Sequence, residues 1–459
     1  MKHFIIRFVI LLVIVAAGLF AYAWKPTFDP ITPPQRADFD QELIEKGAQL
    51  AAVGNCTACH TNPGGRSFAG SFAMPTPFGI IYSSNITPDP ETGIGRWSEA
   101  AFSRSMREGI SRYGSHLYPA FPFDHFTQIS DEDNRALYAF LMTRPAVQQS
   151  PPANELPFPL NIRFILAGWK LLFFDEGAYQ NDASQSDEWN RGAYLVDGLG
   201  HCGACHTPRN AFGAEKRDAY LAGGEAEGWS AFALNETSPA PVPWTADSLY
   251  AYLRQGWHSD HGVANGPMAE VTDNLDLLPD SDIRAIAVYL DSLMGIPSAE
   301  RKQRGEQALK AAAAASDLVL ASTSGEQGDT PAARGEAIYY AACATCHDSN
   351  RPQPFGGSNF HLSTALNAPD PQNAINVILF GLPAASGRQS PIMPGFAATM
   401  NDQQVGDLLA YLREEFTQQP AWDDVASRLA DTRSGKYHVS VRPSDGIERG
   451  PDNIGAKDR

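Results

Sequence analysis

All six cysteines of this 459-residue chain lie in three copies of one five-residue motif, Cys-x-x-Cys-His. A disulfide, a zinc site or a thioredoxin-like redox pair would not explain why a histidine follows the second cysteine every time. The motif is the attachment signature of c-type haem, in which both thiols form thioethers and the histidine ligates the iron. The sequence therefore predicts three covalent haems c. Their predicted ligands are Cys56, Cys59 and His60, then Cys202, Cys205 and His206, and finally Cys343, Cys346 and His347.

The three motifs recur at a spacing that fits one small domain each. Their first cysteines are 146 and then 141 residues apart, a length typical of a compact domain. A short helical pattern that carries a glycine precedes each motif. An amphipathic helical pattern follows each motif and closes the repeat, and it carries an aromatic residue followed by leucine. Because a glycine admits a ring where two helices cross closely, we expect such a crossing in each repeat. The expected pairs are Gly47 with Phe140, Gly192 with Tyr289, and Gly335 with Tyr411.

This pattern is typical of the small all-helical cytochrome c fold. We therefore predict an all-α chain of three tandem cytochrome c-type domains behind an N-terminal membrane segment. Ser130, Asp280 and Asn401 are expected to cap the closing helices of the three repeats. The predicted boundaries are 1–27 for a signal or anchor helix, 38–150 for repeat 1, 151–184 for a connector with an apolar segment, 185–298 for repeat 2, 299–330 for an Ala/Ser/Gly-rich linker, 331–420 for repeat 3 and 421–459 for a polar tail.

Two methionines are candidates for the second axial ligand of the iron. A haem that carries electrons needs such a ligand, and a methionine thioether raises its reduction potential. Met268 lies 22 residues before Leu290, and Met393 lies 19 residues before Leu412. Both precede the closing helix of their repeat, where we predict the distal ligands of haems 2 and 3. The alternative for each is ordinary gap-filling in the core.

Repeat 1 lacks a methionine at the corresponding position. Counting back from Leu141, the leucine that corresponds to Leu290 and Leu412, the same separation falls on Phe121. The ring of phenylalanine cannot ligate iron. Its best replacement is Met106, which we expect on a helix that covers the distal face of the haem. Core packing is the alternative for Met106. Other candidates are Met74, His116 and His125, and an open or weakly ligated first haem is a further alternative.

With these pieces assembled, the chain resembles the tri-haem cytochrome c subunit of membrane-bound bacterial dehydrogenases, including those for alcohol, gluconate, sorbitol and aldehyde. The resemblance covers roughly residues 40–415 and rests also on the stretches Thr76–Asp89, His116–Ala120 and Met393–Phe396. It implies an electron-transfer subunit that passes electrons from a periplasmic dehydrogenase to ubiquinone or a terminal oxidase. Such a subunit performs no substrate chemistry itself.

The residue at position 121 also favours one branch of this family. In the alcohol dehydrogenase branch a methionine follows the Tyr-Pro-Ala stretch, whereas here Phe121 follows it. This is similar to the branch that accompanies molybdenum hydroxylases, such as aldehyde, isoquinoline or nicotinate dehydrogenases. The implied partner is a molybdenum hydroxylase with an iron–sulfur subunit, and a quinoprotein or a flavoprotein is the alternative.

The N-terminus and the charge bear on location and partners. Lys2, His3 and Arg7 precede an apolar run over Phe8–Trp24, and the basic end should stay in the cytoplasm. The repeats are then periplasmic. With the residues before it, the run approaches the ~20 residues that span a bilayer, so we favour an uncleaved anchor over a signal peptide cleaved near Ala23. The net charge of −17 argues against nucleic acid and favours partners with basic docking patches.

The connector and the linker carry two further expectations. Leu160–Phe174 is apolar but too short, and too interrupted by Arg163 and Lys170, to span a membrane. We expect it to lie at a membrane or partner surface, or to pack between repeats 1 and 2. The linker is expected to leave repeat 3 free to take its own orientation.

A second function class is a catalytic multihaem enzyme, such as a peroxidase or a nitrite reductase. That chemistry needs an open coordination position on the iron with acid or base groups beside it. Repeat 1, with Phe121 in the methionine position and His116 and His125 nearby in sequence, is where the pattern would allow it. Binding of carbon monoxide to the reduced protein separates the two classes, because an open iron binds it readily.

Overall fold

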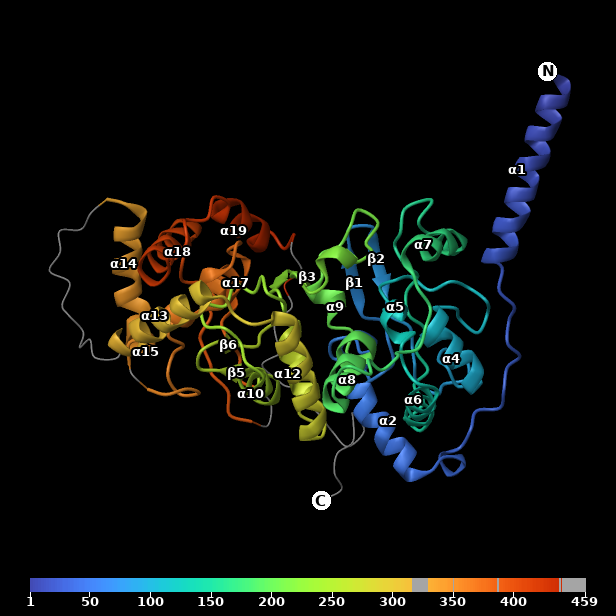
Figure 1. Cartoon of the computed structure of the whole chain (residues 1–459), viewed down its shortest axis with the longest axis horizontal. Helices are drawn as coiled ribbons and strands as arrows, with labels where there is room; N and C mark the ends of the chain where they lie inside the picture. Colours follow the sequence, from blue (N-terminus) through green and yellow to red (C-terminus); the bar gives the residue numbers. More distant parts are fainter. Residues whose placement is uncertain (316–328, 350, 386–387, 437–438, 440–459) are drawn as a thin grey trace. The chain divides into compact units, whose positions relative to one another are not determined.

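The computed structural model describes residues 1–315, 329–349, 351–385, 388–436 and 439. These residues form two compact parts (Figure 1). The first part holds Met1–Asn181 together with Asp197–His201, and the second holds Asp182–Val196 and the described residues from Cys202 to 439. Repeat 1 thus lies in the first part, whereas repeats 2 and 3 share the second.

Helices make up most of the regular structure before residue 181. This part also contains one antiparallel hairpin, in which β1 pairs with β2 and Met74 lies opposite Ile81. In chain order the elements are α1 (Lys2–Ala23), η1 (Arg36–Asp38), α2 (Gln41–Val53), α3 (Cys56–His60), β1 (Ala73–Thr76), β2 (Gly79–Tyr82), α4 (Glu99–Glu108), α5 (Phe123–Phe126), α6 (Asp131–Met142), η2 (Arg163–Ile165) and α7 (Leu166–Phe173).

In the described residues after 181, the pairing of an early helix with a closing helix recurs twice. Two further hairpins, β3–β4 and β5–β6, lie in repeat 2, so the expected all-α fold is largely helical but carries small antiparallel sheets. In chain order the elements are α8 (Asp187–Ala193), η3 (Tyr194–Leu199), α9 (Gly203–His206), η4 (Arg217–Ala219), β3 (Gly224–Ala226), β4 (Trp229–Ala231), α10 (Ala246–Gln255), β5 (Trp257–His258), β6 (Gly262–Val263), α11 (Pro267–Leu275), α12 (Asp280–Met294), α13 (Ala299–Ala315), α14 (Pro331–Ala342), α15 (Ala344–His347), η5 (Phe360–Leu362), α16 (Thr364–Asn367), α17 (Gln372–Phe380), α18 (Asp402–Phe416) and α19 (Val425–Arg433).

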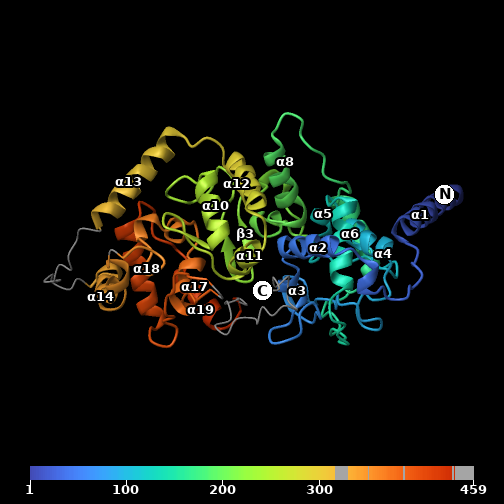
Figure 2. The same ribbon diagram turned by 90° about the horizontal axis from the view of Figure 1, so that it is seen from below.

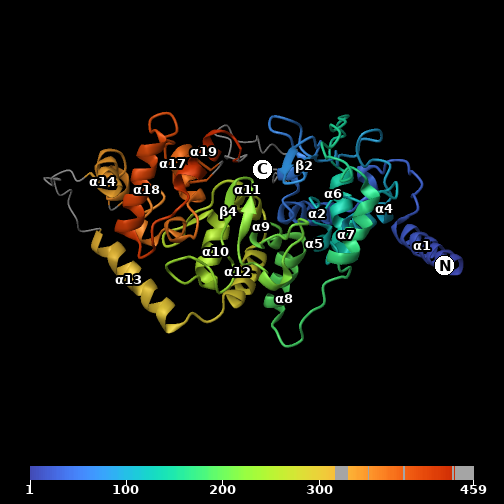
Figure 3. The same cartoon turned by 90° about the horizontal axis from the view of Figure 1, so that it is seen from above.

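The predicted helix crossing is present in all three repeats. α2 crosses α6, α8 crosses α12 and α14 crosses α18 (Figures 2 and 3). A Cβ atom added to Gly47 would lie 2.0 Å from the carbonyl oxygen of Ala136 and 2.7 Å from the Cβ of Phe140. No residue with a side chain fits at that separation, so the glycine sets the crossing distance. The same distances are 2.0 and 2.8 Å for Gly192 against Ala285 and Tyr289, and for Gly335 against Asp407 and Tyr411.

Side-chain caps begin two of the three closing helices as expected. Ser130 Oγ accepts a hydrogen bond from the main-chain N–H of Asp133, and Asn401 forms a capping box with Gln404. Such caps satisfy main-chain donors that the helix leaves unpaired. The predicted cap at Asp280 is wrong, because the cap position is Pro279 and Asp280 lies inside the first turn of α12. There its carboxylate complements the positive end of the helix dipole.

The linker and the tail are more ordered than their composition suggests. Residues 299–315 of the predicted linker form helix α13, in which Arg301 donates to the carbonyl oxygen of Glu236 in repeat 2 and Ala312 accepts from Asn359 in repeat 3. Residues 425–433 of the predicted tail form helix α19, in which Leu429 is buried. Residues 316–328 of the linker and 440–459 of the tail lie outside the described residues.

Repeat 3 does not take its own orientation, contrary to the expectation from the linker. Asn376, which is fully buried on α17, donates to the carbonyl oxygen of Gly228 at 2.8 Å. Asn373 and Ser230 exchange two hydrogen bonds of 2.8 and 2.9 Å. Buried polar groups of this kind are costly to unpair, so these bonds fix repeat 3 against the β3–β4 hairpin of repeat 2.

Candidate haem sites

Each motif histidine is oriented by a main-chain carbonyl group. The Nδ1 atom lies 2.7 Å from the carbonyl oxygen of Ser84 for His60, 2.6 Å from that of Phe232 for His206, and 2.8 Å from that of Ser358 for His347. A carbonyl oxygen only accepts, so Nδ1 carries the proton and donates it. The lone pair of each ring is then on Nε2, the atom that a metal would bind.

The three histidines are also held in the neutral form that a metal ligand requires. Burial lowers the pKa of His60, His206 and His347, and the hydrogen bond from Nδ1 to the carbonyl group acts in the opposite direction. A neutral imidazole with Nδ1 protonated presents its lone pair in one direction only. This is the arrangement expected of a proximal iron ligand.

The cysteines fit haem attachment better than the alternatives. None of the six forms a disulfide, and Cys59 and Cys346 are exposed, so their thiols are accessible to a haem vinyl group. In the described part of the chain, no motif cysteine belongs to a cluster of three His, Cys, Asp or Glu side chains with donor atoms close enough to share a metal ion. Zinc would need such a cluster. The residues present therefore fit haem c.

Glycines allow the main chain to approach the motif histidines. A Cβ atom at Gly70, whose φ is +72°, would lie 2.5 Å from the carbonyl oxygen of Ser84, the acceptor for His60. A Cβ atom at Gly357 would lie 2.9 Å from Nδ1 of His347. The position and conformation of these segments depend on the absence of a side chain.

The two predicted distal methionines lie before the closing helices, as expected. Met268 is half-buried and belongs to the first turn of α11, a short helix that precedes α12. Met393 is half-buried in a loop, where its main chain exchanges hydrogen bonds of 2.9 and 3.0 Å with Leu382. Both side chains are thus carried by segments whose main chain is fixed.

In repeat 1 the candidate distal ligands occupy different environments. Met106 is buried on α4, with 6% of its surface exposed. Phe121 packs edge-on against Phe126 at 5.2 Å. His116 is buried with Nε2 2.8 Å from the carbonyl oxygen of Ala23, and His125 is buried with Nδ1 2.7 Å from that of Asp197. Met74 is half-buried on β1.

Lys170 is a structural residue that the sequence pattern did not single out. It is buried on α7, where its ammonium group donates to the carbonyl oxygens of Glu108 (2.5 Å) and Gly109 (2.8 Å) at the end of α4. Burial lowers the pKa of Lys170 to about 7. A single lysine inside an apolar run was the available signal, and it indicates a cap on the helix that carries Met106.

Comparison with known proteins defines the family. A cytochrome c family model matches residues 44–145, and the model of cbb3-type cytochrome c oxidase subunit III matches residues 330–412. The fructose dehydrogenase cytochrome subunit of Gluconobacter japonicus is 36% identical over 425 residues, which are 89% of this chain and 86% of that protein. The chain belongs to the cytochrome c subunits of bacterial dehydrogenases.

Other members of this family cover the chain to a similar extent. The gluconate 2-dehydrogenase cytochrome c subunit of Pantoea cypripedii is 38% identical over 81% of this chain and 85% of its own length. A nicotinate dehydrogenase subunit of Pseudomonas putida is 47% identical over 91% of this chain, but the match spans only 34% of that protein. The chain is therefore an electron-transfer subunit with haem c, as the resemblance implied.

Proposed function

We propose that this cytochrome c subunit carries three haems c and passes electrons from a dehydrogenase catalytic subunit to ubiquinone or a terminal oxidase. The observation that carries the proposal is the threefold recurrence of one arrangement. In each repeat a half-buried histidine directs Nδ1 at a main-chain carbonyl group beside two cysteines that form no disulfide. Each repeat, with the boundaries predicted above, would then be one cytochrome c domain.

The chain's own residues would hold and tune the cofactor. Cys56, Cys202 and Cys343, each with the second cysteine of its motif, would form the thioethers. A bound haem iron supplies reversible one-electron chemistry. The hydrogen bond from the proximal histidine to a carbonyl group keeps the ring orientation fixed and raises the basicity of Nε2. Met268 and Met393 are proposed as distal ligands in repeats 2 and 3, and Met106 in repeat 1.

The nicotinate dehydrogenase relative indicates the class of partner. That protein matches 91% of this chain at 47% identity, and Phe121 replaces the methionine of the alcohol dehydrogenase branch. We therefore favour a molybdenum hydroxylase with an iron–sulfur subunit as the partner. Elemental analysis of the copurified complex, together with mass spectrometry of its extracted cofactors, tests this: molybdenum supports the proposal, whereas a quinone cofactor or a flavin without molybdenum contradicts it.

We propose that α1 anchors the protein in the inner membrane with the repeats in the periplasm. This helix has 22 residues and a mean hydropathy of 2.8 over its most apolar window, and at ~1.5 Å per residue it is long enough to cross the hydrocarbon core. Near its end, Phe20 packs against Phe164 at 5.7 Å. Leu171 and Leu172, on α7 in the same part, expose 61% and 70% of their surface and would lie at the membrane surface.

The experiment for the proposed function uses the complex purified from membranes. Addition of the partner's substrate should reduce the haems, and added ubiquinone should reoxidise them. A protein that instead turns over hydrogen peroxide or nitrite without the partner, with carbon monoxide bound to one reduced haem, would contradict electron transfer as its role. That result would favour the catalytic alternative in repeat 1.

A further inference from the structure

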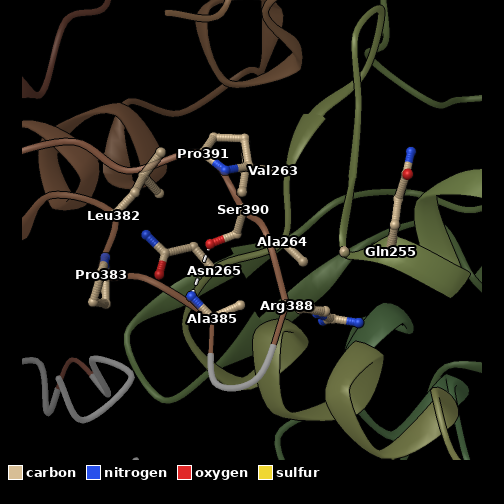
Figure 4. A pocket seen from close by; sticks show the side chains of 11 residues that line it. Gln255, Val263, Ala264, Asn265, Leu382, Pro383, Ala385, Arg388, Ser390 and Pro391 are labelled. Atoms are coloured by element: carbon tan, nitrogen blue, oxygen red, sulfur yellow. Dashed lines mark hydrogen bonds between the residues drawn. The ribbon is translucent and has the colours of Figure 1, made fainter. Parts of the chain in front are cut away.

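The loop that carries Met393 is closed at its base and reaches into repeat 2. Leu382 and Met393 pair through two main-chain hydrogen bonds, and the main-chain N–H of Ala385 donates to Ser390 Oγ at 2.8 Å (Figure 4). Arg388 lies inside both closures, two residues before Ser390. Its side chain extends from the loop towards a helix of repeat 2 in Figure 4.

Arg388 binds the end of one helix and the body of another in repeat 2. It donates to the Asp273 carboxylate at 2.5 Å, to Thr272 Oγ1 at 3.2 Å and to the carbonyl oxygen of Arg254 at 3.3 Å. The side chains of Arg388 and Asp273 are only 17% and 5% exposed. Because a buried carboxylate is costly without its partner, this ion pair is a fixed contact rather than a surface encounter.

Two of the three acceptors of Arg388, Thr272 and Asp273, lie on α11, the helix that carries Met268 in its first turn. Asp273 lies on α11, five residues after Met268 in the first turn. A second contact joins the loops directly, because Asn265 Nδ2 donates to the carbonyl oxygen of Gly381 at 3.2 Å. The segments that carry Met268 and Met393 are therefore held together by two separate contacts.

The space between the segments that carry Met268 and Met393 is small and polar. A small hollow lies between the two loops (Figure 4), and it is lined by Gln255, Asn265, Leu382, Arg388, Ser390 and Pro391. Gly256 makes room for the arginine, since a Cβ atom there would lie 2.9 Å from Arg388 Nη2. The bonds from α17 to the β3–β4 hairpin, described above, fix the same two repeats at a separate place.

We infer that Arg388 is a positioning residue for electron transfer between repeats 2 and 3. Through Asp273 it holds the Met393 loop on the helix that starts at Met268 and so fixes the separation of the two distal faces. With haem bound in both repeats, one electron would pass from the reduced iron of one repeat to the oxidised iron of the other, and no bond or proton would be exchanged at the loops. The rate of such a step falls steeply with distance. This inference rests on the proposed ligation by Met268 and Met393.

The test compares variants of the full chain with all haems attached. Arg388→Gln and Asp273→Asn remove the ion pair, and Arg388→Lys restores a positive charge. Arg334→Gln is the matched control, because the ion-pair partners of Arg334, Asp407 and Asp329, lie outside repeat 2. Electron transfer between the haems is followed after rapid photoreduction. We expect it to slow by about tenfold in Arg388→Gln and Asp273→Asn, to recover in Arg388→Lys, and to be unchanged in Arg334→Gln.

A second measurement does not depend on redox activity. Hydrogen exchange should rise at the main-chain amides of Leu382 and Met393 in Arg388→Gln but not in Arg334→Gln. Unchanged exchange and unchanged transfer rates in both Arg388→Gln and Asp273→Asn would overturn the inference, as would a change of haem ligation in Arg388→Gln. If Met268 and Met393 are not the iron ligands, a different result is expected: the haem spectra would be unaffected in Met268→Ala and Met393→Ala.

Discussion

The Nδ1 atom of His206 lies 2.6 Å from the carbonyl oxygen of Phe232, 26 residues further along the chain. His60 and His347 make the same contact with carbonyl groups 24 and 11 residues away. The contact recurs although the acceptor residue and its distance in sequence differ. A main-chain acceptor can be supplied by any residue type, so the folded path of the chain, rather than a side chain, orients each proximal histidine.

Replacement of the distal methionines should change individual haems. Met268→Ala and Met393→Ala each remove a thioether, so one haem in each variant should shift to a lower reduction potential or to a high-spin spectrum. Spectroelectrochemical titration measures both properties. Met142→Ala is the control, because Met142 lies on α6 outside the predicted ligand positions. Unchanged spectra and potentials in both variants would place the ligands elsewhere.

Met106→Leu tests the distal ligand of repeat 1. Leucine keeps the volume and apolarity of this buried position and deletes only the sulfur. If Met106 ligates the iron, the variant should bind carbon monoxide at one haem after reduction, with little change in thermal unfolding because the swap conserves volume. The visible spectrum of the reduced protein under carbon monoxide is the measurement. An unchanged spectrum in Met106→Leu would mean that Met106 only packs in the core. The distal position of the first haem would then hold a histidine or be open.

The helix crossings should not tolerate a side chain at the glycine. In Gly192→Ala the new Cβ would lie 2.0 Å from the carbonyl oxygen of Ala285, and overpacking of this kind costs about 1–3 kcal/mol. Thermal or denaturant unfolding should show that loss. Gly406→Ala on α18 is the control, since no atom lies within 4 Å of its added Cβ and helix propensity there favours alanine by about 0.5–1 kcal/mol. Equal stability of the two variants would contradict the observed crossing geometry.

Lys170 should make the stability of the first part depend on pH. Burial lowers the pKa of Lys170 from its ordinary 10.5 to about 7; the charges of Glu108 and Glu176 oppose that shift and the charge of Lys25 adds to it. At pH values between about 7 and 10.5, the unfolded chain binds one more proton at Lys170 than the folded chain does. The free energy of unfolding should therefore rise with pH across this range, by at most about 1.4 kcal/mol per pH unit, and the destabilisation is fully present below pH 7.

The measurement for Lys170 is the difference in unfolding free energy between wild type and Lys170→Met as a function of pH. The variant should lack the rise between pH 7 and 10.5 that the wild type shows. Lys302→Met, at an exposed position on α13, should keep it. Parallel curves for wild type and Lys170→Met would mean that the ammonium group keeps its ordinary pKa in the folded protein.

The haem-attachment motifs could be recognised and the helix crossings predicted from sequence because short-range chemistry determines them. Six cysteines in three identical motifs leave few alternatives, and a glycine opposite an aromatic residue at the same place in each repeat indicates a close crossing. The glycine positions Gly47, Gly192 and Gly335 are confirmed to the residue. The capping residues Ser130 and Asn401 are also confirmed. They could be predicted because a capping residue acts on the helix that it directly precedes.

The joint between repeats 2 and 3 could not be predicted in this way. Composition over 299–330 suggested a flexible linker, but the relative position of the repeats is fixed by Asn376, Asn373 and Arg388, whose partners lie more than 100 residues away in sequence. Lys170 was likewise interpreted only as an interruption of an apolar run. Such long-range polar contacts carry no periodic signal, so they become visible only in the folded chain.

The number of haems per chain tests the central claim most directly. Each motif histidine is oriented in the same way and each motif has both cysteines outside any disulfide, so all three repeats should attach haem c. The measurement is a pyridine haemochrome assay of the purified protein, calibrated by amino-acid analysis and checked by intact mass. The account predicts three covalent haems per chain. A count of one or two in fully matured protein would contradict it.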